Sequence, residues 1–99
     1  MQVAPNQTIL EGVVRKITPE VSGFGRELVV DVEAARPAGG KQDFLNATRG
    51  DRVKVLLSAP DDVQVGQRYA MRTTVLGGPR GERTVVESIR RTRTAALPD

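Results

Sequence analysis

Hydrophobic residues in this chain alternate with polar ones in short runs, which is the period of β-strands rather than of helices. The clearest run is 26–35, RELVVDVEAA, in which every second residue is apolar. One face of this strand carries Leu28, Val30, Val32 and Ala34, and the other carries Glu27, Val29, Asp31 and Glu33. We therefore expect the first face to lie in the core and the second to be wet.

Four further runs, 8–17, 52–58, 68–76 and 83–90, are also rich in β-branched residues and predict strands. Gly12 interrupts the first run, which predicts a bulge or tight bend that lets this strand serve both halves of a small barrel. Val53, Val55 and Leu57 are expected to point inward. In 68–76 both faces are mixed, so the alternation leaves open which one is buried. In 83–90 the apolar residues do not all fall at alternate positions of the strand, which predicts another bulge.

The connections between these runs contain glycine and proline. Segments 18–25 and 77–82 predict a loop and a hairpin turn, respectively. Segment 36–50 has too many helix-breaking residues for a long helix, and it predicts an extended loop or a short helical turn near 43–48. There Phe44 and Leu45 would cover an open end of the barrel. Residues 1–7 are expected to form a flexible lead-in and 92–99 a flexible tail.

Five strands in 99 residues predict one all-β domain spanning 8–91, a small barrel rather than a sandwich. The phrases ILEGVVRKI, GRELVVDVE, RVKVLLS, VGQRYAMRTTVLGG and RTVVESI, in that order, resemble an oligonucleotide/oligosaccharide-binding (OB) fold. The resemblance implies a five-stranded Greek-key barrel with a long loop or short helical turn between strands two and three. It also implies a ligand face on strands two and three, flanked by the loop after strand one and the hairpin between strands four and five.

The composition removes most catalytic chemistry. The chain contains no cysteine and no histidine, so thiolate metal sites, disulfides and the commonest general acid/base are absent. Asp61 and Asp62 are adjacent carboxylates, but such pairs are more typical of a solvated turn than of a metal site. We therefore expect no catalytic activity, no metal and no small-molecule cofactor. No apolar run is long enough to cross a membrane and the first residues lack a secretory signal, so we expect a cytoplasmic protein without membrane contact.

The positive charge is concentrated late in the chain. The formal net charge is only +3, yet residues 68–93 contain seven arginines against Glu82 and Glu87. Such an excess attracts phosphate if the side chains converge on one face, and it is a solvated strand exterior if they do not.

These features predict a domain that binds single-stranded DNA or RNA. Single strands are held by basic grooves and by planar side chains on which bases stack, and Phe24 is the candidate for stacking unless it folds over the barrel end. The ten candidate residues are Phe24, Arg26, Arg52, Lys54, Arg68, Arg72, Arg80, Arg83, Arg90 and Arg91. The acids on strand two would repel a phosphate backbone, so strands four and five are the first place to look.

The alternative is a protein-interaction or assembly module. In this interpretation the barrel presents Val29, Leu56 and a strand edge to a protein partner or to a second copy of itself. The fold alone does not choose between the two functions.

Overall fold

The computed structural model describes residues 6–19, 25–43, 45–58, 61–77 and 81–92, and these form five strands. The strands are β1 (Thr8–Pro19), β2 (Arg26–Pro37), β3 (Arg52–Leu57), β4 (Arg68–Leu76) and β5 (Arg83–Arg91). All five agree with the predicted ranges to within two residues at each end. Most of the predicted lead-in and tail, residues 1–5 and 93–99, lies outside the described residues.

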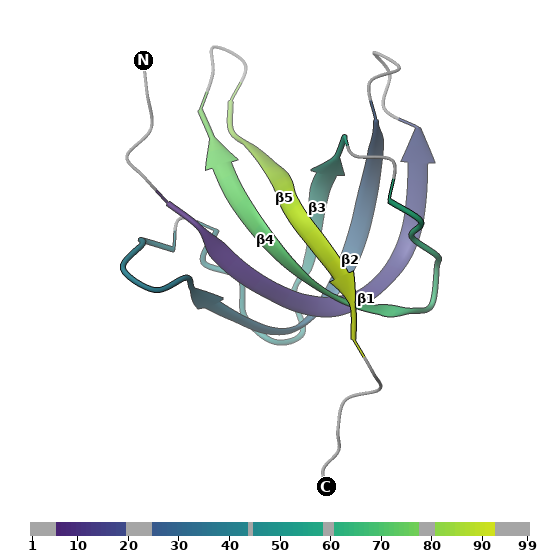
Figure 1. Ribbon diagram of the computed structural model, residues 1–99, viewed down its shortest axis with the longest axis horizontal. Coiled ribbons are helices and arrows are strands. Elements are labelled where there is room, and N and C mark those ends of the chain that lie inside the picture. Colours follow the sequence, from purple (N-terminus) through teal and green to yellow (C-terminus); the bar gives the residue numbers. More distant parts are fainter. Residues whose placement is uncertain (1–5, 20–24, 44, 59–60, 78–80, 93–99) are drawn as a thin grey trace, which may run out of the picture.

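The five strands close into a ring in the order β1-β2-β3-β5-β4, with β4 returning to β1. β1 is the shared strand: its first half pairs with both β2 and β4, and Figure 1 shows it as a long curved strand. All neighbours are antiparallel except β3 and β5, which are parallel and meet at Leu56 and Val85. This closed sheet is compatible with an OB-like barrel.

Three bulges set which side chains face inward. The β1–β2 register shifts after Glu11 and again after Val14, which leaves Glu33 on β2 and Arg15 on β1 as extra residues. The β4–β5 register shifts after Arg72, which leaves Glu87 as the extra residue on β5. The expected irregularities at Gly12 and in the fifth strand are thus confirmed. Ala34 was predicted to face the core but is exposed, because the bulge at Glu33 reverses the alternation beyond it.

Gly12 lies where β1 is pinched between β2 and β4. It pairs with Val32 on one side and with Tyr69 on the other. A Cβ atom at this position would lie 2.2 Å from the carbonyl oxygen of Asp31 and 2.8 Å from a methyl group of Val30. Only a residue without a side chain allows the two backbones to approach so closely.

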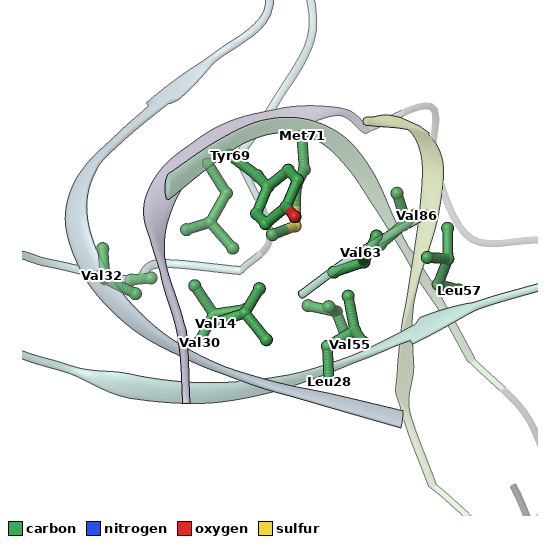
Figure 2. Packing of buried hydrophobic residues seen from close by; sticks show 12 residues of the cluster. Val14, Leu28, Val30, Val32, Val55, Leu57, Val63, Tyr69, Met71 and Val86 are labelled. Carbon is green, nitrogen blue, oxygen red and sulfur yellow. The ribbon is translucent and has the colours of Figure 1, made fainter. Parts of the chain in front are cut away.

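The core fills the inside of the ring. Its fully buried members come from β1 to β4 and include Leu10, Leu28, Val30, Val55, Leu57 and Met71, and β5 adds Val86, which is 8% exposed. Figure 2 shows the ring of Tyr69 pointing into this core beside Met71. The buried face of β4 is therefore the one that carries Tyr69, Met71, Thr73 and Val75. The phenol oxygen of Tyr69 accepts a hydrogen bond of 2.8 Å from the backbone N–H of Gln64, so the buried hydroxyl has a partner.

The described residues between β2 and β3 contain no helical turn, which corrects that option of the prediction. Instead, the Asp43 carboxylate organises the loop by accepting hydrogen bonds from the backbone N–H groups of Leu45 and Asn46 and from the Thr8 hydroxyl. Leu45 packs against the core, whereas Phe44 lies outside the described residues.

Asn6, just before β1, ties the start of the described chain to β4. Its side chain is buried and makes two hydrogen bonds to the backbone of Val75, one as donor and one as acceptor. An amide side chain is suited to this place because it can donate and accept at once, as a neighbouring strand would.

Candidate nucleic-acid interface

On the face of β2 and β3, where the OB resemblance places a ligand, an ion-pair network occupies the end at which β3 begins. Asp31 of β2 lies opposite Arg52 of β3, and one carboxylate oxygen accepts a hydrogen bond of 2.8 Å from the Arg52 Nε. The other oxygen accepts one of 2.5 Å from Arg15, the bulged residue of β1. The Arg52 hydrogen bond is the main cause, and the Arg15 hydrogen bond the second, of a lowered pKa for the Asp31 carboxyl.

The lowered pKa gives this network a pH signature. Because the folded-state pKa of Asp31 lies below its ordinary value of 3.8, the ionised carboxylate stabilises the fold above that pH and loses its contribution as the pH falls further. We expect Asp31→Asn to lower the free energy of unfolding at neutral pH. The difference in this free energy between the variant and the wild type should narrow below about pH 4. Urea unfolding across this pH range measures the difference. Asp62→Asn, which removes an exposed loop carboxylate, is the control. If the difference between Asp31→Asn and the wild type does not change with pH, the assigned role of Asp31 is contradicted.

A second ion pair crosses β1. Arg68 of β4 donates from Nε to both carboxylate oxygens of Glu33, each at 2.9 Å, although the strand between them belongs to β1. The bulge on β2 leaves Glu33 without a partner in the β1 register. The hydrogen bonds that Arg68 donates to Glu33 raise the pKa of the Arg68 guanidinium, which is charged at any physiological pH in either case.

These ion pairs make two of the candidate residues less available to a phosphate. Arg52 and Arg68 were predicted to bind phosphate, and both already contact a carboxylate. Where β2 pairs with β3, the charged residues of outward parity are Glu27, Asp31, Arg52 and Lys54, two acids and two bases, and the charge of Glu33 further along β2 is paired with Arg68. The face therefore has no charge excess with which to attract a polyanion.

The other candidates are spread around the ring. Arg26 starts β2 and donates to the backbone oxygen of Asp61, and Arg91 ends β5 and donates to the Gln67 side chain. Lys54 is exposed on β3, and Arg83 is exposed at the start of β5, opposite Leu76. Phe24 and Arg80 lie outside the described residues.

Arg72 and Arg90 are the two candidates that the structure brings together. They project from the outer faces of β4 and β5 into a groove of about 250 Å³ whose floor is formed by β1, β4 and β5. The strand register places the lining side chains in two adjacent rows. The first row runs Arg36, Ile9, Arg72 and Ser88. The second runs Glu11, Ala70 and Arg90.

The groove has an apolar floor and a positive rim. Ile9 and the small side chain of Ala70 provide the apolar surface, and the three arginines with one glutamate give a net charge of +2. Glu11 lies 3.5 Å from the nearest guanidinium nitrogen of Arg36. Arg72 donates one of its five N–H groups to the Gln7 side chain at 3.1 Å, which fixes its position beside the groove.

A hydrogen-bond chain supports this edge of the groove. The Gln7 side-chain oxygen accepts the hydrogen bond from Arg72, and the Gln7 side-chain nitrogen donates in turn to one oxygen of the Glu87 carboxylate. The Thr74 hydroxyl donates to the other oxygen of that carboxylate. Glu87 is the bulged residue of β5, so the bulge directs a carboxylate toward β4 and the chain preceding β1. The arrangement holds Arg72 in place indirectly, through Gln7.

Reasoning from the sequence missed seven lining residues: Ile9, Glu11, Arg36, Ala70, Met71, Ser88 and Ile89. The alternation of 8–17 already placed Ile9 and Glu11 on the face opposite Leu10. Arg36 was missed because the second strand was predicted to end at residue 35, whereas β2 continues to Pro37 and pairs Arg36 with Ile9.

The described parts of the chain show no metal-binding group and no membrane-spanning helix. No three aspartate or glutamate side chains among them lie close enough together to hold a metal ion. They also form no helix that is long and apolar enough to cross a bilayer.

Comparison of the chain with models of known protein families, with curated proteins and with solved structures gives no match. We therefore infer a function from the geometry of the groove and the charge of each face.

Proposed function

We propose that this protein binds single-stranded nucleic acid, without catalysis, on an OB-like Greek-key barrel. The observation that carries the proposal is the groove on β1, β4 and β5, which combines a net positive charge with an apolar floor. Single-stranded nucleic acid requires both, because cationic side chains hold its phosphates while flat or apolar surfaces support its bases. The strand order, with β1 shared between β2 and β4, supports the OB-like assignment.

The site would differ from the one that the OB resemblance implies. On β2 and β3 the Asp31 and Glu33 carboxylates hold Arg15, Arg52 and Arg68, and a phosphate would have to compete with them. In the groove, Arg72 and Arg90 have no carboxylate within ion-pair distance among the described residues, since Arg36 is the groove arginine that pairs with Glu11. Arginine planes can also take the place of the aromatic rings that this chain lacks, because bases stack on guanidinium groups.

The proposal predicts salt-dependent binding that requires the groove. Fluorescence anisotropy of a labelled single-stranded oligonucleotide should show micromolar binding at low salt. If Arg72 and Arg90, the groove arginines without a carboxylate partner among the described residues, each neutralise a phosphate, log Kobs should fall with log[salt] with a slope of about −1.4. The double substitution R72E/R90E should weaken binding by at least about tenfold and flatten the slope by about 1.4, which is about 0.7 for each lost phosphate contact.

The matched control is the double charge reversal K16E/K54E at two exposed lysines that flank Val29 of β2, which changes the net charge of the protein by the same amount. We expect it to weaken binding much less than the groove variant does. Absence of binding at low salt would contradict the function, and equal losses in the two variants would contradict the location.

The alternative function, protein interaction or assembly, has less support. Val29 and Leu56, the apolar residues expected to meet a partner, are half-buried rather than exposed. The exposed large apolar side chains of the described residues are Val65 and Leu76, which lie in a loop and at the end of β4. Isolated residues of this kind are common on protein surfaces.

A further inference from the structure

Among the described residues, Glu11 is the one acidic side chain that lines the groove, and phosphate binding does not explain it. Its carboxylate weakens the attraction of the groove for phosphate, yet its side chain is 40% exposed and begins the second row of lining residues, beside Ala70. On both sides of it across the sheet the neighbours are alanines, Ala34 of β2 and Ala70 of β4. A small residue on each side leaves the Oε1 atom of Glu11 open to a ligand, while its Oε2 atom lies 3.5 Å from Arg36.

The size of the groove limits what can meet this carboxylate. Its volume of about 250 Å³ is below the roughly 300–1,000 Å³ of sites that enclose drug-sized ligands, so it fits a fragment such as one nucleobase. A planar base can lie on the apolar surface of Ile9 and Ala70. The guanidinium groups of Arg72 and Arg90, on adjacent rows of the rim, can stack on the base or bind the phosphates beside it.

An ionised carboxylate only accepts hydrogen bonds, so it selects a ligand edge that donates them. Cytosine presents an N4 amino group, and glutamate accepts from this group in known modes of base recognition. Uracil has the same ring but carries a carbonyl oxygen at that position, which would face the carboxylate with a second acceptor. Adenine and guanine also carry exocyclic amino groups.

We propose that the groove binds single nucleobases that bear an exocyclic amino group, with Glu11 as the hydrogen-bond acceptor that discriminates against uracil and thymine. This inference rests on the proposed nucleic-acid function and adds a base preference to it. Glu11 would thus act as a specificity residue, and the arginines would supply affinity.

Homopolymers of deoxycytidine and deoxyuridine of equal length test the preference, because the two bases are both pyrimidines that differ at the position in question. In anisotropy titrations at one low salt concentration, we expect the cytosine strand to bind about tenfold more tightly than the uracil strand. Glu11→Gln should bring the two affinities to within about twofold of each other, since the amide can also donate. The uracil strand should bind this variant at least as tightly as it binds the wild type.

Glu27→Gln is the control, because it removes one negative charge from the outward side of β2 and should leave the preference intact. Circular dichroism of both variants checks that they fold. If neither homopolymer binds the wild type, the proposed function fails. If both bind equally, the function stands and the base preference is overturned. If the Glu11→Gln variant still binds the cytosine strand more tightly than the uracil strand, the role of Glu11 is overturned. Its carboxylate is then only the ion-pair partner of Arg36.

Discussion

Replacing Gly12 with alanine is expected to lower the free energy of unfolding by about 3 kcal/mol, at the upper end of the usual cost of overpacking. The added methyl group would lie 2.2 Å from the backbone oxygen of Asp31, where no flexible side chain can move aside. β1 or β2 must shift instead, and β1 is hydrogen-bonded to β4 on its other side. Since a small domain is stable by only about 5–15 kcal/mol, this loss is a large fraction of the total.

Urea denaturation followed by circular dichroism measures the change. Gly39→Ala is the matched control, because nothing lies within 4 Å of the position that its Cβ would occupy. That variant should be neutral or more stable by a few tenths of a kcal/mol, since alanine restricts the unfolded chain more than glycine does. Equal stabilities of the two variants would contradict the close approach of β1 and β2.

Leu28→Ala is expected to destabilise the protein by about 2–5 kcal/mol, the range observed when a buried leucine leaves a cavity. Leu28 is 0% exposed on β2 and pairs in register with Val55 of β3, beside which it lies in Figure 2. β3 closes the ring to β5 through a short parallel contact, so β4 and β5 have little means of filling the cavity.

Leu76→Ala makes the same chemical change at a position that is 48% exposed, near the end of β4. We expect a change of less than about 1 kcal/mol there. Thermal and urea unfolding of both variants compare the two positions, and similar losses would mean that the interior of the ring does not carry the stability assigned to it.

The strand positions could be predicted because alternation and glycine placement are local properties. The bulged residues were harder, because a bulge is defined only against a neighbouring strand. In the sequence, Glu33 falls at one of the alternating positions that face outward. Nothing in the neighbouring residues shows that the alternation reverses after Glu33 and exposes Ala34. The buried face of β4 was undecided for another reason. Ala70 and Leu76 make the outer face almost as apolar in the sequence as the face that carries Thr73.

The candidate site was predictable only in part. Excess arginine in 68–93 directed attention to β4 and β5, where Arg72 and Arg90 line the groove. The sequence could not show that Arg68 contacts Glu33, which lies 35 residues earlier and on the far side of β1. Nor could it show that Arg36 joins the groove, because this depends on β2 continuing to Pro37. Ion pairing and register are long-range properties, so composition alone overestimates the cations available to a ligand.

The double pairing of β1 also determines how the chain can fold. Thr8 pairs with Thr73, 65 residues later, and a ring closed by such distant partners has a high contact order. Domains of this kind fold in milliseconds to seconds rather than microseconds. During synthesis, β1 can pair with β2 early but has no second neighbour until residues 68–73 have left the ribosome. Until then one edge of β1 is open to other chains, and Leu10 and Val14 lack the β4 side chains that cover them in the folded protein.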